Sequence, residues 1–236
     1  MYELTEHAET ASYAAQAHSS GKKIAAVADI LFMLSQSDPT VKICDTLTAA
    51  VRSLRTEDIP DVSGIKKYIL LARALERIDE TEEQLKGFQS ELKGALTELY
   101  KTDELLRTLS EQLEKENDIL LELEIKINQF LGSDTVFSQN EKQLLLRQLS
   151  DMNMSRIVAA KNRQLIDSLS AKNSTLVSGI YSIETTLLPL WRAQLSEARS
   201  SCTSDDIKRS FETGQLTAEK LLSLANNVLK NRVEYK

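Results

Sequence analysis

The chain has 236 residues, of which 42% are hydrophobic and 27% charged, a composition typical of a folded, soluble protein. Its longest apolar run, residues 24–34, contains Asp29 and is far shorter than the roughly 20 residues that a membrane-spanning helix needs. Acidic residues outnumber basic ones by 35 to 29, and this net charge of −6 disfavours nucleic acid as the principal partner.

The termini, cysteines and histidines give no sign of secretion, metal binding or catalysis. The N-terminus is acidic where a signal peptide would be basic, so we expect a cytoplasmic protein. Cys44 and Cys202 belong to no C-x-x-C motif, and a helix would hold His7 and His18 about 16 Å apart, so no metal site is predicted. No P-loop, G-x-S-x-G or H-E-x-x-H motif occurs, so we predict neither a cofactor nor a catalytic residue.

Seven glycines and three prolines are few for this length and predict an all-α fold of long helices. Residues 1–60 are expected to form short helices: an alanine-rich one over 3–20, an amphipathic one over 24–34, and a third over 39–55 that begins at Pro39. Residues 56–64 hold a proline, a glycine and three acids, which predicts a boundary between residues 1–60 and 61–236.

A heptad repeat from Leu85 to Phe130 is the most informative pattern in the sequence. Twelve of its fourteen a and d positions are apolar, against about six expected by chance, and the exceptions are Thr102 and Glu116. We therefore predict a helix over residues 65–131, about 100 Å long, that packs against a partner helix. The a positions are Leu85, Leu92, Leu99, Leu106, Leu113, Leu120 and Ile127, and the d positions are Phe88, Ala95, Thr102, Leu109, Glu116, Leu123 and Phe130.

A short turn is predicted to join this helix to the next. Gly132 is placed to end the first helix, and Ser138-Gln139-Asn140-Glu141 is a capping box that starts the second. So short a connection favours an antiparallel hairpin of residues 65–131 and 139–200. Residues 76–126 carry fifteen acidic and seven basic residues, whereas 141–172 carry six basic and three acidic ones, and this difference also favours their pairing.

The returning helix has a less regular apolar pattern. Pro189 is expected to kink or end it, and Thr203-Ser204-Asp205-Asp206 to start a last helix, over about 204–231, that folds back on the hairpin. The residues expected to face the first helix are Leu145, Leu149, Met152, Val158, Leu165, Leu169, Leu176, Ile180, Ile183, Leu187 and Leu190.

The stretch 189–194 reads Pro-Leu-Trp-Arg-Ala-Gln and resembles the P-L-W-K-x-Q signature of the toxic-anion (tellurite) resistance family, often called TelA-like. The Lys-Lys-Tyr sequence at 66–68 and the leucine-rich acidic stretch at 103–116 follow in the order of that family, as does a Lys-Asn-x-x-Leu step at 172–176. The likeness covers about residues 65–230. It implies a cytoplasmic helical protein associated with survival of tellurite and related envelope stress, and it establishes no enzymatic activity.

Five residues are candidate binding residues. Trp191 either anchors the base of the hairpin or contributes a binding surface. Arg192 and Arg199 are seven residues apart on one helical face and would suit an oxyanion or an acidic partner. Lys172 and Asn173 are alternatively interhelical contacts or ligand contacts.

Three hypotheses for the function follow. The favoured one is a non-enzymatic stress-resistance protein that acts as a helical scaffold or adaptor through a protein partner. The second is a structural coiled-coil protein that forms homo-oligomers or belongs to a phage or envelope complex. The third, an enzyme acting on tellurite directly, has little support because the two cysteines are far apart and no cofactor motif occurs.

Overall fold

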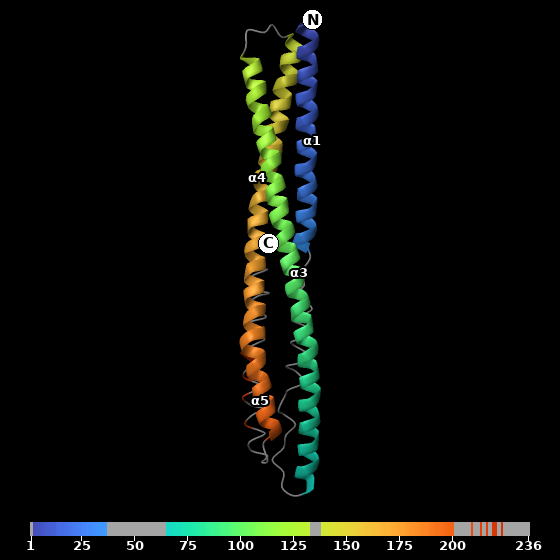
Figure 1. Cartoon of the computed structure of the whole chain (residues 1–236), viewed down its shortest axis with the longest axis vertical. Coiled ribbons are helices and arrows are strands. Elements are labelled where there is room, and N and C mark those ends of the chain that lie inside the picture. Colours follow the sequence, from blue (N-terminus) through green and yellow to red (C-terminus); the bar gives the residue numbers. More distant parts are fainter. Residues whose placement is uncertain are drawn as a thin grey trace. The chain divides into compact units, whose positions relative to one another are not determined.

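The computed structural model describes residues 2–36, 65–132 and 138–200 and isolated helical positions between 209 and 223 (Figure 1). In chain order the elements are α1 (Tyr2–Gln36), α3 (Ile65–Leu131), α4 (Gln139–Ser182), the π-helical turn η2 (Ile183–Leu187) and α5 (Leu188–Ser200). No strand occurs among the described residues, which confirms the all-α prediction. The predicted helix 39–55 and boundary 56–64 lie outside the described residues, as does nearly all of 204–231. None of the described helices is both long and apolar enough to cross a bilayer.

The chain divides into two compact units. Unit one comprises residues 1–37 and 102–171, and unit two comprises residues 38–101 and 172–236. Both α3 and α4 contribute to each unit, because the division falls within these helices.

The predicted hairpin is confirmed, including the bounds of its first helix. The amide of Gly132 donates to the Asn128 carbonyl at 3.0 Å, which closes the last turn of α3. At the start of α4 the capping box forms: the Ser138 amide donates to Glu141 Oε2 at 2.9 Å, and the Glu141 amide donates to Ser138 Oγ at 3.3 Å.

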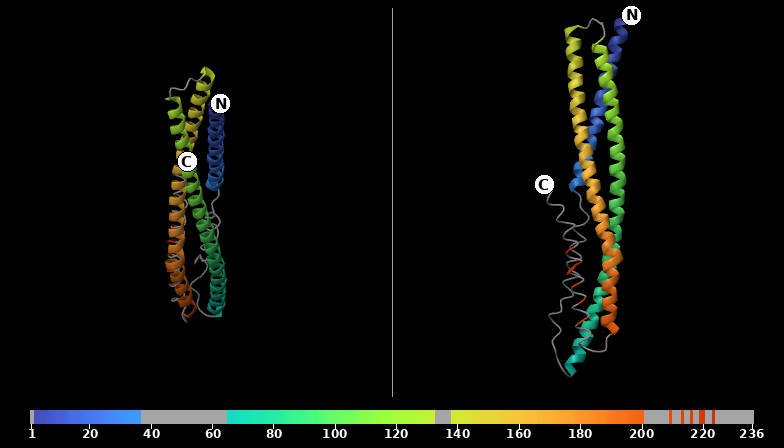
Figure 2. Two further views of the ribbon diagram at one scale, coloured as in Figure 1. Left: turned by 45° about the horizontal axis from the view of Figure 1, so that its top comes forward. Right: turned by 90° about the vertical axis from the view of Figure 1, so that its left-hand side faces the viewer.

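Unit one is a three-helix bundle in which α1 packs along the halves of α3 and α4 nearest their connection (Figures 1 and 2). Two contacts between α3 and α4 show that these helices are antiparallel: Glu114 pairs with Arg163, and Glu124, ten residues on, pairs with the earlier Arg156. The apolar core draws on all three helices. It consists of Ile24, Val27 and Leu31 of α1, Leu106, Leu109, Leu113, Leu120, Leu123 and Ile127 of α3, and Leu145, Met152, Ala159 and Ile166 of α4.

The heptad positions predicted for α3 face the core in both units. All seven a positions are buried, and so are five of the seven d positions, while Thr102 and Phe130 are half-buried. Residues at other heptad positions, such as Glu98, Glu104 and Lys115, are exposed. The period of 3.5 residues therefore describes the packing of this helix from Leu85 to Phe130.

The prediction of two helices within residues 3–34 is wrong, because α1 runs through Gly21 without a break. A Cβ atom added at Gly21 would lie 3.1 Å from Ser155 Oγ, so the glycine allows α1 to approach α4 closely. Buried or half-buried residues also continue through this position at steps of three and four residues. They are Tyr13, Ala17, Ser20, Ile24, Val27, Leu31 and Leu34. Packing of this stripe outweighs the cost of one glycine, about 1 kcal/mol.

The stripe predicted for α4 is partly wrong. Val158 and Leu165, which were expected to face α3, are each 37% exposed, and the next residues along the chain, Ala159 and Ile166, are buried instead. The other predicted positions with described side chains, except Leu190, are buried or half-buried.

In unit two a π-helical turn explains the exposure of Leu190. Ile180 and Ile183 are buried before η2, and the Leu188 amide bonds to the carbonyl of Ile183, five residues earlier. The additional residue in this turn moves the buried stripe on by one position. Trp191 is therefore buried, while Leu190 is 47% exposed.

Pro189 does not end the helical run, because α5 continues to Ser200. Proline lacks an amide proton, and its ring clashes with the carbonyl four residues earlier in an α-helix. The wider turn of η2, which ends two residues before Pro189, accommodates both effects.

Glycine-to-alanine substitutions will distinguish the close contact at Gly21 from ordinary helix propensity. Gly87→Ala and Gly94→Ala should each stabilise the protein by about 0.5–1 kcal/mol, because the added methyl group meets no atom within 4 Å. Gly21→Ala should gain less, because its methyl group meets Ser155 Oγ at 3.1 Å. The midpoint of urea unfolding measures each effect.

Ser155→Ala supplies the control, since it removes the hydroxyl that Gly21→Ala would meet. The double variant Gly21→Ala, Ser155→Ala should recover the gain seen at Gly87, after correction for Ser155→Ala alone. If Gly21→Ala by itself stabilises as much as Gly87→Ala, close approach is not the reason for the glycine.

Candidate functional site

Among its described residues, unit one has one buried carboxylate in the core. Glu116 occupies a d position of the α3 heptad and is only 3% exposed. Moving a carboxylate out of water is costly unless a positive charge or hydrogen-bond donors compensate it. Its partners therefore decide what this position does.

Lys23 of α1 provides the compensating charge. Its Nζ atom donates to Glu116 Oε1 at 2.7 Å. The Lys23 side chain is 50% exposed, whereas that of Glu116 is 4% exposed, so the ammonium group reaches the core while part of its side chain stays in water. This ion pair joins α1 to α3 across 93 residues of sequence.

The surroundings of Glu116 favour its charged form. Burial by itself raises the pKa of the carboxyl group, but the hydrogen bond from Lys23, the hydroxyl of the buried Ser20, and the charges of Lys23 and Lys115 outweigh that effect. The pKa of Glu116 therefore lies below the ordinary value for glutamate, and the side chain is ionised at neutral pH.

Asn162 connects the third helix to the same region. It is 7% exposed, and its Nδ2 atom donates to the backbone carbonyl of Ile24 at 3.2 Å. We call Ser20, Lys23, Glu116 and Asn162 the polar layer, because they lie within one short section of the bundle and come from all three helices.

The polar layer gives α1 one preferred position along the hairpin. If α1 slid by one heptad, Gln16 or Ile30 would take the place of Lys23 and leave the Glu116 carboxylate uncompensated. Buried polar pairs in coiled coils set helix register in this way, at some cost in stability. The layer thus acts as a register device, and this role needs no ligand.

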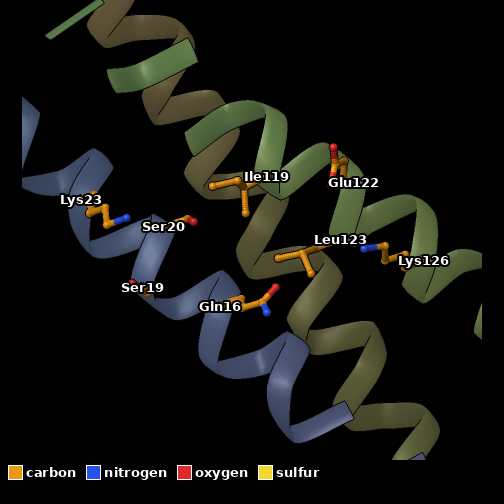
Figure 3. A pocket seen from close by; sticks show the side chains of 8 residues that line it. All are labelled: Gln16, Ser19, Ser20, Lys23, Ile119, Glu122, Leu123 and Lys126. Carbon is orange, nitrogen blue, oxygen red and sulfur yellow. The ribbon is translucent and has the colours of Figure 1, made fainter. Parts of the chain in front are cut away.

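A groove of about 260 Å³ lies beside the polar layer, between α1 and α3 (Figure 3). Ile119 and Leu123 point from α3 toward α1, whereas Glu122 points away from it. The rim carries charges of both signs, from Lys23, Lys126 and Glu122. No group of three or more metal-ligating side chains occurs within the described parts of the chain.

Of the three candidate binding residues on α5, the two arginines contact the chain's own α3. Trp191 is completely buried. Arg192 Nη2 donates to Gln89 Oε1 at 2.8 Å, and Arg199 Nη1 lies 3.2 Å from Asp79 Oδ1 and 3.7 Å from Glu82 Oε2. The acidic partner expected for the arginines is thus supplied, at Arg199, by α3 itself.

Lys172 and Asn173 lie apart from the residues on α5. Eighteen residues of helix separate Asn173 from Trp191, which is about 27 Å at the standard rise. Both Lys172 and Asn173 are half-buried, and Asn173 Nδ2 has no hydrogen-bond partner among the described residues. The five candidates therefore do not form one cluster, and a binding role for any of them stays a prediction.

A second stripe, of four apolar and three charged residues, lies on the surface of α4. Its members follow one another at alternating steps of three and four residues and are all exposed: Leu144, Arg147, Asp151, Met154, Val158, Lys161 and Leu165. We call these residues the outer stripe. Leu144 is 56% exposed and Met154 61%, and on α4 outside the stripe Leu146 and Ile157 are exposed as well, at 50% and 51%.

The outer stripe has a signal in the sequence that the prediction of a single irregular stripe overlooked. Leucine, methionine and valine at 144, 154, 158 and 165 fit heptad spacing, as do the buried residues at 145, 152, 159 and 166. The two stripes are adjacent on the helix. The single stripe predicted from the sequence combined residues of the buried one, such as Leu145 and Met152, with Val158 and Leu165 of the outer one. The Lys23–Glu116 pair was missed as well, although Glu116 already stood out as a charged d position.

A scan against family models, a search of curated proteins and a search of solved structures each return no match for this chain. The likeness to the toxic-anion resistance family therefore rests on its short sequence motifs, chiefly that at 189–194, and the geometry of unit one is the firmer guide to what the protein does.

Removal of the Glu116 charge should make the stability of the protein less dependent on acid. Because the pKa of Glu116 is lowered in the folded state, its stabilising effect is present above the ordinary pKa of 4.5 and is lost as the pH falls through the folded-state value. Glu116→Gln should cost about 1 kcal/mol at neutral pH. Urea unfolding from neutral pH down to about pH 3 should show the difference from wild type shrinking.

Lys23→Gln should destabilise the protein more than Glu116→Gln, by about 3 kcal/mol, because it leaves a buried carboxylate uncompensated. Lys86→Gln is the matched control, since Lys86 pairs with Glu83 where both side chains are exposed, and it should cost less than about 0.5 kcal/mol. Equal costs for Lys23→Gln and Lys86→Gln would show that the buried pair does not hold α1.

Proposed function

We propose that the protein is a non-enzymatic helical scaffold that acts through protein–protein contacts. The outer stripe of α4 is the observation that carries this proposal. It presents Leu144, Met154, Val158 and Leu165 to solvent on a helix whose adjacent face is already packed in the core.

The chemistry of the outer stripe is that of a helix-binding surface. Spaced apolar side chains on one helical face are the anchors by which helices recognise one another. Met154 lies in the middle of the stripe, and methionine adapts readily to the shape of a partner. Arg147 and Lys161 flank the apolar residues, and their long aliphatic stems extend the surface that a partner would cover.

The polar layer supports the same proposal from inside the bundle. A scaffold must hold its helices in one arrangement, and the Lys23–Glu116 pair fixes α1 along α3. A buried ion pair is less stabilising than an apolar pair of similar size, and this loss is acceptable where the helices must hold one defined surface.

The resemblance at residues 189–194 suggests the process that the scaffold serves. We include in the proposal a cytoplasmic role in resistance to tellurite and related envelope stress, because that likeness, although short, is the sequence feature that names a physiological setting. The outer stripe would then bind a protein of that response.

Deletion of the gene in its host tests the physiological part of the proposal. The lowest tellurite concentration that stops growth should fall on deletion and return when the wild-type gene is supplied on a plasmid. Unchanged growth under tellurite and envelope stress would refute the role in resistance.

A stripe variant tests whether the outer stripe is the working surface. Met154→Glu should fail to restore resistance, because it places a charge at the centre of the apolar residues. Asn153→Glu adds the same charge to the adjacent, exposed position outside the stripe, and it should restore growth fully. If the two variants behave alike at equal protein levels, the stripe is not the site of contact.

A further inference from the structure

We infer that the outer stripe binds a second copy of the same chain, with the two α4 helices antiparallel. This inference deepens the proposed scaffold role by naming one partner of the stripe, and its geometry stands independently of the role in tellurite resistance. The order of apolar and charged residues along the stripe carries the argument.

The stripe alternates between two heptad positions. One holds Leu144, Asp151, Val158 and Leu165, and the other holds Arg147, Met154 and Lys161. When two such helices pack antiparallel, residues of one position face residues of the other. A two-fold axis relates the copies, so each contact occurs twice.

One register matches six of the seven stripe residues with one another, and Leu144 then faces Ser168, which lies outside the stripe. With the axis level with position 156, Met154 faces Val158 of the second copy, and Asp151 faces Lys161. Arg147 faces Leu165, over which its aliphatic stem can lie. The interface then has an apolar centre, an ion pair on each side of it, and an arginine–leucine contact beyond each ion pair.

Other arrangements match fewer residues of the stripe. With the axis level with position 149, Arg147 faces Asp151 and Leu144 faces Met154, but Val158, Lys161 and Leu165 face no residue of the stripe. A shift by one heptad in one direction sets Asp151 against Met154 and Lys161 against Leu144, and in the other it sets Lys161 against Val158. Parallel helices would bring each residue opposite its own equivalent, so Asp151 would face Asp151 and Lys161 would face Lys161. Charge complementarity therefore favours the antiparallel arrangement, and the register centred at position 156 pairs the largest part of the stripe. A stripe that complements itself in this way fits a second copy.

The packing within unit one leaves this face of α4 accessible. Arg156 and Arg163 point to α3, where they pair with Glu124 and Glu114, so α3 covers one flank of α4. Ser155 and Asn162 face α1 on the other flank. The outer stripe lies next to these two residues and away from α3, and all seven of its residues are exposed. Asp151 and Lys161 do not compete with the proposed ion pair by pairing within one chain, because ten residues of helix, about 15 Å, separate them.

Charge reversal on the full-length chain tests the inference, with sedimentation velocity over a range of concentrations as the readout. The wild-type protein should form a dimer that weakens with salt. Asp151→Lys or Lys161→Asp alone should weaken it about tenfold, because each places like charges opposite each other twice per dimer. The double variant Asp151→Lys, Lys161→Asp should restore wild-type affinity, since it restores both pairs with reversed sign.

Asp167→Lys is the matched control. Asp167 is exposed on α4 outside the stripe, and its substitution changes the net charge as much as Asp151→Lys does. It should leave the dimer unchanged. Circular dichroism should show equal helix content in all four variants, so that any loss of the dimer is not a loss of folding.

A monomeric wild-type protein at every concentration would overturn the inference, and so would a dimer that the single reversals leave intact or that the double variant fails to restore. The outcomes separate this inference from the proposed function. A dimer with the expected charge rescue in a protein whose deletion has no effect on growth would sustain the inference alone. A monomer whose deletion sensitises the host would sustain the scaffold role alone.

Discussion

The apolar stripe of α3 is the constraint on which the rest of the structure depends. Its a positions, from Leu85 to Ile127, are buried without exception, and they supply core residues to both compact units. Within each unit the helices that pack on this stripe must fit its spacing. α1 does so with small residues and a glycine, and the chain around Pro189 does so with a π-helical turn.

Apolar packing alone would leave α1 free to choose among positions that differ by a heptad. The Glu116 carboxylate removes that freedom, because it is tolerated only where Lys23 reaches it. The dimer inferred for the outside of α4 would use the same principle, because Asp151 and Lys161 face each other only in the register that pairs most of the stripe. In both places apolar residues favour the packing of one helix on another, and a few charged residues determine the register in which the helices pack.

Sequence patterns predicted the structure correctly where the determining residues lie close together in the chain. The leucine repeat of α3, the glycine at 132 and the capping box at 138–141 each reflect short-range rules, and each is confirmed. α1 was divided wrongly because its stripe includes Tyr13, Ala17 and Ser20, whose burial depends on tertiary contacts. The Lys23–Glu116 pair joins residues too distant for any local rule, and the exposure of Val158 could be decided only by the position of the neighbouring helices.

The π-helical turn also fixes how this chain can be cut or extended. One residue of α-helix turns the chain by about 100°, so the additional residue in η2 sets which face of α5 meets α3. A foreign helix joined in regular α geometry after Ser182 would present the side equivalent to Leu190 where Trp191 now packs. Any chimera or shortened version of the hairpin must therefore keep Ile183–Leu187 together with Pro189. This short segment rotates the following helix so that Trp191, and not Leu190, is buried.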